Sequence, residues 1–326
     1  MFVATALLII GLILLAYGAD RLVFSASILC RSFGIPPLII GMTVVSIGTS
    51  LPEIILAFSA AQHGQMDIAV GTALGSNITN ILLILGGAAL LHPLTVHSNL
   101  IRRELPLMLL VSLLSGLMLF DNQLSRLDGL GLLAIAALYL LIIISIARRA
   151  EQHHNDILTR EQLAELPREE TGNTVAFLWL AMALLIMPIA TRMVIDNATA
   201  FADYFGISEL VLGLTLIAVG TSLPELATVI AGALKGEDDI AIGNLIGANI
   251  YNIAIVLGLP ALAHPASVDV YAFARDYWVM LVVSTLFALI CLQRKRRIGR
   301  RAGAILLGGF IVWVLLLWLH PAFIDG

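Results

Sequence analysis

Long apolar segments separated by short polar ones dominate this chain of 326 residues. The apolar segments repeatedly reach the roughly 18 residues that a helix needs to cross about 30 Å of hydrocarbon. A membrane β-barrel would instead show short segments of alternating polarity. The pattern therefore predicts ten membrane-spanning helices, with residues 22–29 apolar enough to lengthen the first. The predicted spans are residues 2–20, 36–61, 67–93, 104–121, 127–147, 174–195, 208–234, 239–263, 276–292 and 302–320.

The longest polar segment, residues 148–173, separates the first five predicted spans from the last five. We therefore expect an all-α polytopic membrane protein in two parts, residues 1–147 and 174–326, joined by this linker.

The sequence contains an internal repeat. Residues 33–93 align without a gap with residues 205–265 at an offset of 172, and 29 of these 61 positions are identical. The identical stretch Gly-Thr-Ser-Leu-Pro-Glu occupies positions 48–53 and 220–225. Because five spans separate each residue from its counterpart, the two copies should enter the membrane from opposite faces. Such inverted five-helix repeats are typical of transporters that work by alternating access.

Composition and charge agree with a membrane protein. The chain is 60% hydrophobic and 12% charged, against about 25% charged residues in soluble domains. Lys and Arg accumulate on the cytoplasmic side of membrane proteins. An outside N-terminus places 15 of the 18 basic residues inside, so both termini should lie outside and the central loop should be cytoplasmic. The net charge of −4 gives no reason to expect a nucleic-acid partner.

Glycine and proline residues predict irregular backbone in the second and third spans of each half. Proline removes a backbone donor, and glycine tolerates irregular dihedral angles. Irregular backbone at membrane depth is tolerated where it lines a cavity, so four broken helices are expected to meet there. The expected break positions are Gly48, Pro52, Gly71 and Gly75, with Gly220, Pro224, Gly243 and Gly247 as counterparts.

Glu53 and Glu225 lie about midway along their spans. A charge there costs about 2.5 to 3.5 kcal/mol and suggests function. No Lys or Arg of the spans can neutralise the pair, so a metal cation is the economical counter-ion. The neighbouring groups are hard oxygen donors, which favour Ca²⁺ or Na⁺. These neighbours are Thr49, Ser50, Thr221, Ser222, Asn80 and Asn252.

Each of these residues also has a purely structural interpretation. A glutamate after proline is common in the first turn of a helix, although its duplication in an apolar context argues against this explanation. Serine and threonine hydroxyls often bond a carbonyl one turn back. Asn77 and Asn249 are expected to satisfy the broken backbone rather than to contact an ion.

The repeated motifs resemble those of the sodium/calcium exchanger family, whose repeats carry G-T-S-x-P-E and G-x-x-x-G-S-N-x-x-N patterns. The second pattern corresponds to residues 71–80 and 243–252. The resemblance implies a ten-helix antiporter similar to compact bacterial inner-membrane members. It implies a Ca²⁺ site with Glu53, Glu225, Thr49 and Thr221, and flanking Na⁺ sites with Ser50, Ser222, Ser76 and Asn80.

Two positions depart from relatives in this family. Ala248 stands where some relatives have serine, and Asn252 stands where some have an acidic residue. One hydroxyl ligand is then missing, and the central charge is carried by Glu53 and Glu225.

These observations favour a secondary transporter in a bacterial inner membrane, with no resident cofactor, that exchanges Na⁺ for Ca²⁺ through one set of carboxylates. A Ca²⁺/H⁺ exchanger is the alternative, because protons can also neutralise the two glutamates. An intramembrane hydrolase with two carboxylates is less well supported, since no nucleophile or histidine accompanies the symmetric pair. A passive channel would show flux without dependence on a counter-ion.

Overall fold

The computed structural model describes residues 2–33, 46–96, 103–153, 172–235, 238–293 and 296–319. These residues are almost entirely helical, and the strands among them are four segments of two residues each. The helices of the first half are α1 (Phe2–Ser32), α3 (Ser46–Thr49), α4 (Leu51–Gln62), α5 (Met66–Thr79), the π-helical η2 (Asn80–Leu85), α6 (Gly86–Leu91), α8 (Glu104–Leu119) and α9 (Arg126–His153).

The second half repeats much of this order. Its helices are α11 (Asn173–Phe205), α12 (Glu209–Leu212), the π-helical η3 (Gly213–Ile217), α13 (Ala218–Thr221), α14 (Leu223–Lys235), α15 (Asp238–Tyr251), the π-helical η4 (Asn252–Leu257), α16 (Gly258–Ala263), the π-helical η5 (Ala272–Tyr277), α17 (Trp278–Leu292) and α18 (Arg300–Leu319). The π-helical turns η2 and η4 stand at the same offset of 172 residues as the repeated sequence.

The described residues contain seven helices that are long and apolar enough to cross a membrane. An eighth span is the pair formed by residues 209–221 and 223–234, which bends by 47° between its two parts. Two of the ten expected spans are therefore not among these membrane-spanning helices. Helix α8 has only 16 residues, and part of the predicted span 36–61 lies outside the described residues.

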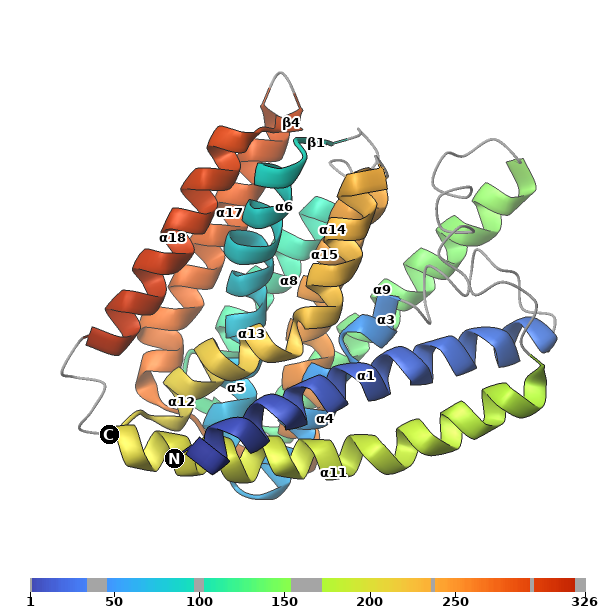
Figure 1. Cartoon of the computed structure of the whole chain (residues 1–326). Coiled ribbons are helices and arrows are strands. Elements are labelled where there is room, and N and C mark those ends of the chain that lie inside the picture. The colour runs from blue at the N-terminus through green and yellow to red at the C-terminus, as the bar shows by residue number, and fades with distance from the viewer. Residues whose placement is uncertain are drawn as a thin grey trace.

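The arrangement separates central spans from peripheral ones. The span Met66–Leu91 and the span Ala241–Ala263 are buried along most of their length, whereas α1, α9, α11 and α18 expose most of theirs. Helices α1 and α11 pack against each other and run obliquely across one end of the bundle (Figure 1). Exposed leucine and isoleucine side chains on these outer helices, which would be costly in water, suit contact with lipid.

The sequence prediction of breaks at glycines in the third spans is wrong. Helix α5 continues through Gly71 and Gly75 without interruption, and α15 continues through Gly243 and Gly247. At Gly75 an added Cβ would lie 2.4 Å from the carbonyl oxygen of Leu214. The first pair of glycines therefore lets α5 approach the backbone of α12 and η3 closely. The irregular turn comes later, as η2 and η4.

Three boundaries also differ from the prediction. Helix α9 continues past residue 147 to His153, into the predicted linker. Helix α11 continues past residue 195 to Phe205, where Gly206 ends it in the left-handed conformation with φ 64°. The ninth span begins at Ala272 rather than at 276. The extension of the first helix through residues 22–29 is confirmed, since α1 reaches Ser32.

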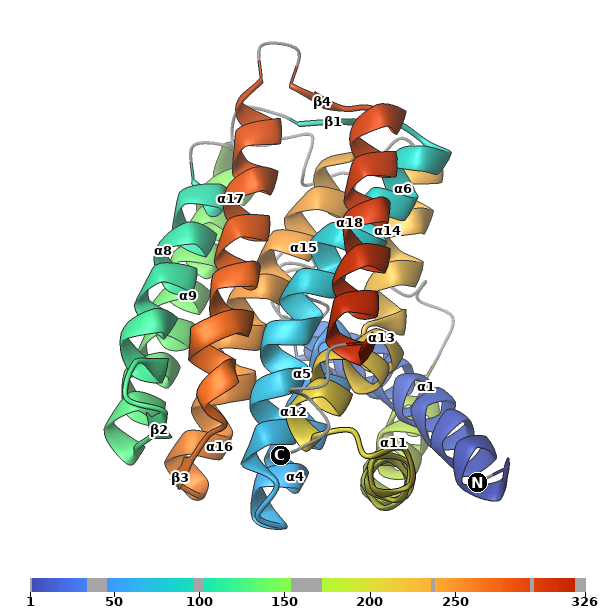
Figure 2. The same ribbon diagram turned by 90° about the vertical axis from the view of Figure 1, so that its left-hand side faces the viewer.

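Two short antiparallel strand pairs join the halves at opposite ends of the bundle. Strand β1 (Leu94–Thr95) pairs with β4 (Arg297–Ile298), and β2 (Gln123–Leu124) pairs with β3 (Ala266–Ser267). Each pair contains one strand from each half of the chain. Figure 2 shows β1 and β4 at one end of the long helices and β2 and β3 at the other.

Candidate functional site

A single residue interrupts the helix in front of each glutamate. Ser50 lies between α3 and α4 with φ −85° and ψ 6°, and Ser222 lies between α13 and α14 with φ −80° and ψ 13°. Pro52 and Pro224 follow two residues later, and proline has no N–H group for the carbonyl four residues before it. Each break thus leaves a backbone carbonyl without its usual helical donor. The predicted interruption of both second spans is confirmed.

Glu53 and Glu225 are 0% and 2% exposed. Each accepts a hydrogen bond from the serine at the break in the other half of the chain. Ser222 Oγ donates to Glu53 Oε1 at 3.1 Å, and Ser50 Oγ donates to Glu225 Oε1 at 3.3 Å. These two hydrogen bonds bring four of the predicted site residues into one buried site. The two serines are 172 residues apart in the sequence, and so are the two glutamates.

Several oxygens of this region have no hydrogen-bond partner within the described residues. The other carboxylate oxygen of each glutamate, Oε2, is among them, together with Ser76 Oγ, Asn80 Oδ1 and Asn252 Oδ1. Neither carboxylate forms an ion pair with a basic side chain among the residues that the structure describes. Buried polar atoms are normally hydrogen-bonded, and an unpaired buried charge is costly. A bound cation would compensate these oxygens.

The two predicted threonines lie beside the carboxylates, and Thr221 also has a hydrogen bond within its own span. Thr221 Oγ1 donates to the carbonyl of Ile217 at 3.0 Å, one turn earlier in the same span. Its hydroxyl is also within hydrogen-bonding reach of Glu53, and Thr49 has the corresponding relation to Glu225. A threonine whose hydrogen is held by a carbonyl directs oxygen lone pairs elsewhere, as a cation ligand must.

The asparagines form contacts between the halves. Asn77 Nδ2 donates to the backbone carbonyl of Asn249 at 3.1 Å, so Asn77 does bond the backbone, although this carbonyl lies in α15 and not at a helix break. The structure differs from the prediction for Asn249, whose side chain contacts other side chains among the described residues. Asn249 Oδ1 accepts from Asn80 Nδ2 at 2.9 Å. Asn80 and Asn252 begin the π-helical turns η2 and η4, a feature frequent at functional sites.

Two methionines behind the asparagines were not predicted. Asn249 Nδ2 contacts Met108 Sδ at 3.8 Å, and Asn77 Nδ2 contacts Met280 Sδ at 3.6 Å. Both methionines are buried. They also stand 172 residues apart, so extending the alignment of the repeats into the fourth spans would have identified them as a pair.

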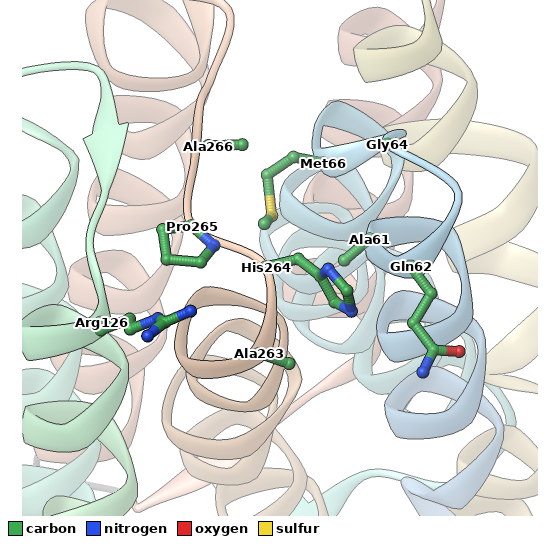
Figure 3. A pocket seen from close by; sticks show the side chains of 9 residues that line it. All are labelled: Ala61, Gln62, Gly64, Met66, Arg126, Ala263, His264, Pro265 and Ala266. Carbon is green, nitrogen blue, oxygen red and sulfur yellow. The ribbon is translucent and has the colours of Figure 1, made fainter.

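A cavity of about 390 Å³ lies away from these residues, between the end of α4 and the turn from α16 to β3 (Figure 3). Gln62, Arg126 and His264 supply its polar side chains. Its lining contains a cationic group and no carboxylate, so its chemistry does not suit a metal cation. The buried carboxylates, and not this cavity, form the candidate cation site.

The chemistry of the site is that of a hard-cation site. Within the part of the chain that the structure covers, no group of three or more His, Cys, Asp or Glu side chains could hold a metal ion. The two carboxylates could supply two negative charges to a cation, and hydroxyl, amide and backbone oxygens are available nearby as further donors. Oxygen donors of this kind suit Ca²⁺ and Na⁺ rather than softer transition metals.

Comparisons with known proteins agree with this geometry. The sequence profile described as sodium/calcium exchanger protein matches residues 3–145 and 175–319. Inner membrane protein YrbG of Escherichia coli (strain K12) is 66% identical, with both chains covered completely. Sodium/calcium exchanger MaX1 of Methanosarcina acetivorans is 30% identical, with 96% of this chain and 97% of that protein covered.

A solved structure of the sodium-calcium exchanger NCX_Mj, soaked with Na⁺ and Sr²⁺, has the same fold. It matches with a TM-score of 0.63 and 30% sequence identity, over 95% of this chain and 97% of that one. These similarities confirm the resemblance in the repeated motifs. The chain belongs to the sodium/calcium exchanger family.

Proposed function

We propose that this protein exchanges Na⁺ for Ca²⁺ across a bacterial inner membrane by alternating access. The observation that carries the proposal is the reciprocal, buried arrangement of Glu53 with Ser222 and of Glu225 with Ser50. Two carboxylates balance the charge of one Ca²⁺, or of two Na⁺ ions. Because both ions need the same charges, they compete for the site. The protein then changes faces only when one or the other has neutralised the glutamates.

The proposed ligands are those predicted from the sequence. Glu53, Glu225, Thr49 and Thr221 serve Ca²⁺, while Ser50, Ser222, Ser76 and Asn80 serve Na⁺, and Asn252 adds an amide oxygen. The unpartnered oxygens of Glu53, Glu225, Ser76, Asn80 and Asn252 support this assignment. The carbonyls freed by the two prolines would complete the donor set.

The proposed architecture is ten spans in two inverted repeats. The strand pairs support the inversion. Strand β1 follows the third span of the first half, and β3 follows the corresponding span of the second, yet they lie at opposite ends of the bundle (Figure 2). An inverted pair can rock about a central site and open it to either side in turn. In the proposed orientation both termini are periplasmic and the linker is cytoplasmic.

Proton coupling is the second candidate function. The Oε2 atoms of both glutamates, which have no hydrogen-bond partner among the described residues, favour it, because such a buried carboxylate oxygen can be neutralised by a proton as well as by a metal ion. A Ca²⁺/H⁺ exchanger would use the same two residues with different coupling.

Uptake of ⁴⁵Ca²⁺ into proteoliposomes distinguishes the two. The vesicles hold the purified protein and are loaded with Na⁺ or K⁺ at fixed pH, with a proton ionophore present. We expect uptake only from Na⁺-loaded vesicles. In a second experiment without the ionophore, uptake that follows an imposed pH gradient in the absence of internal Na⁺ would refute Na⁺ coupling in favour of proton coupling. Absence of uptake in both cases would refute Ca²⁺ as the substrate.

A further inference from the structure

Asn80 can act as a cation ligand in only one of its two amide orientations. Its Oδ1 atom offers lone pairs, whereas its Nδ2 atom carries two hydrogens and would repel a cation. The two orientations have nearly the same shape, so hydrogen bonds rather than packing decide between them. Asn80 is 1% exposed, and its Oδ1 atom has no hydrogen-bond partner among the residues that the structure places.

The bond that decides the orientation comes from the other half of the chain. Asn80 Nδ2 donates to Asn249 Oδ1 at 2.9 Å, and both residues are buried. An amide nitrogen cannot accept a hydrogen bond. If Asn249 turned its amide over, two NH₂ groups would face each other. Asn80 would then have to turn as well, and its nitrogen would replace its oxygen.

The orientation of Asn249 is set in turn by Met108. Asn249 Nδ2 lies 3.8 Å from Met108 Sδ, and a thioether sulfur accepts hydrogen bonds but cannot donate one. The sulfur therefore favours the nitrogen of Asn249 on its side and leaves the oxygen for Asn80. Met108 lies on α8 and Asn249 on α15, and these two helices pack against each other.

We infer that Asn249 is a positioning residue which, supported by Met108, holds Asn80 with its oxygen available to the transported cation. The inference rests on the proposed function, in which Asn80 belongs to a Na⁺ site. Asn249 does not need to touch the ion. Its side chain acts through Asn80, much as outer hydrogen-bond partners orient the ligands of metal sites.

The counterpart of this contact in the other repeat, between Asn77 and Met280, offers a matched control. Asn77 Nδ2 contacts Met280 Sδ at 3.6 Å, but it also donates to the backbone carbonyl of Asn249 at 3.1 Å. A backbone carbonyl is a stronger acceptor than a thioether and already fixes the orientation of Asn77. Loss of the Met280 sulfur should therefore change little, whereas loss of the Met108 sulfur removes the acceptor that orients Asn249.

The test compares Asn249→Leu, Met108→Leu and Met280→Leu in proteoliposomes. Leucine has about the volume of methionine, so the methionine replacements keep the packing. Two reactions are measured: release of ⁴⁵Ca²⁺ as external Na⁺ is raised, and exchange of ⁴⁵Ca²⁺ against unlabelled Ca²⁺ in Na⁺-free medium. The second reaction reports on the Ca²⁺ site and on correct folding without involving Na⁺.

We expect Asn249→Leu to raise the Na⁺ concentration for half-maximal release about tenfold, the lower end for loss of an outer partner of a metal ligand. Met108→Leu should raise it by about two- to threefold and Met280→Leu should leave it unchanged, since a thioether is a weak acceptor. Exchange of Ca²⁺ against Ca²⁺ should stay within twofold of the unmodified protein in all three variants.

Unchanged Na⁺ dependence in both Asn249→Leu and Met108→Leu would overturn the inference, as would equal losses in the two reactions. If Asn249→Leu does not fold, the difference between Met108→Leu and Met280→Leu decides. Failure of the proposed function has another signature. An unmodified protein that exchanges Ca²⁺ against Ca²⁺ but does not respond to Na⁺ would refute Na⁺ coupling, and with it the Na⁺ role of Asn80.

Discussion

Replacing Glu53 by glutamine removes one negative charge from the buried pair while keeping the size of the side chain. Glu53 and Glu225 are 0% and 2% exposed, and the described residues place no basic partner beside either. A Ca²⁺ ion bound to the variant would therefore leave one positive charge unbalanced in a buried site. Removing one partner of a buried ion pair costs about 3–5 kcal/mol.

Each 1.4 kcal/mol corresponds to about a tenfold change in affinity, so we expect Ca²⁺ affinity to fall by roughly 10²- to 10⁴-fold in Glu53→Gln. The same reasoning applies to Glu225→Gln, because each carboxylate is buried and accepts a hydrogen bond from the serine of the other half. At Ca²⁺ concentrations that saturate the unmodified protein, exchange should stop in both variants, although the protein still inserts into the membrane.

The assay is ⁴⁵Ca²⁺ uptake into Na⁺-loaded proteoliposomes over a range of external Ca²⁺, with equal amounts of inserted protein. Glu209→Gln is the matched control, since it makes the same chemical change earlier in the bent span that carries Glu225. Glu209 Oε1 accepts from Gln65 Nε2 at 2.9 Å, and a glutamine oxygen can accept the same bond. We expect uptake by this control to equal that of the unmodified protein.

Uptake by Glu53→Gln with a half-maximal Ca²⁺ concentration within tenfold of the unmodified value would refute the charge-balance argument. Loss of uptake in Glu225→Gln alone would show that the two carboxylates are not equivalent, against their reciprocal contacts in the structure. Equal loss in the Glu209→Gln control would point to a general loss of folding instead of a specific site.

Two further predictions test the fold. Gly75→Ala places a Cβ 2.4 Å from the carbonyl oxygen of Leu214, so it should destabilise the protein by about 1–3 kcal/mol and lower the Tm in detergent. Gly87→Ala is the control and should leave the Tm unchanged, because no atom lies within 4 Å of its added Cβ. Equal Tm values for the two variants would contradict the close approach of α5 and η3. The second prediction uses single cysteines in a variant without the native cysteines. If the repeats are inverted, a cysteine at Ser267 should react with a membrane-impermeant maleimide from the outside, whereas one at Thr95 should react only after permeabilisation. Labelling of both from one side would contradict the inversion.

The prediction of the fold was most successful where a local pattern carries the information. The length of an apolar segment decides whether a helix can cross a membrane, and the extended first helix, α1, follows this rule. The end of α11 was missed because residues 196–205 mix polar and aromatic side chains, and no proline or glycine stops the helix before Gly206. The glycines of α5 suggest helix breaks when only the sequence is considered, because a sequence does not distinguish a flexible position from one where another helix needs the space.

The sequence by itself determined the chemistry of the site. Two carboxylates, each preceded by a proline in the repeated stretch Gly-Thr-Ser-Leu-Pro-Glu, are local features of a duplicated segment, and they favour a hard cation as the ligand. The tertiary structure decided which side chains form hydrogen bonds with one another. The bond from Ser222 to Glu53, the bond from Ser50 to Glu225 and the contact of Asn249 with Asn80 all cross between the halves. Such contacts depend on how the helices pack, and periodicity within one segment contains no information on the neighbour that packing brings to it.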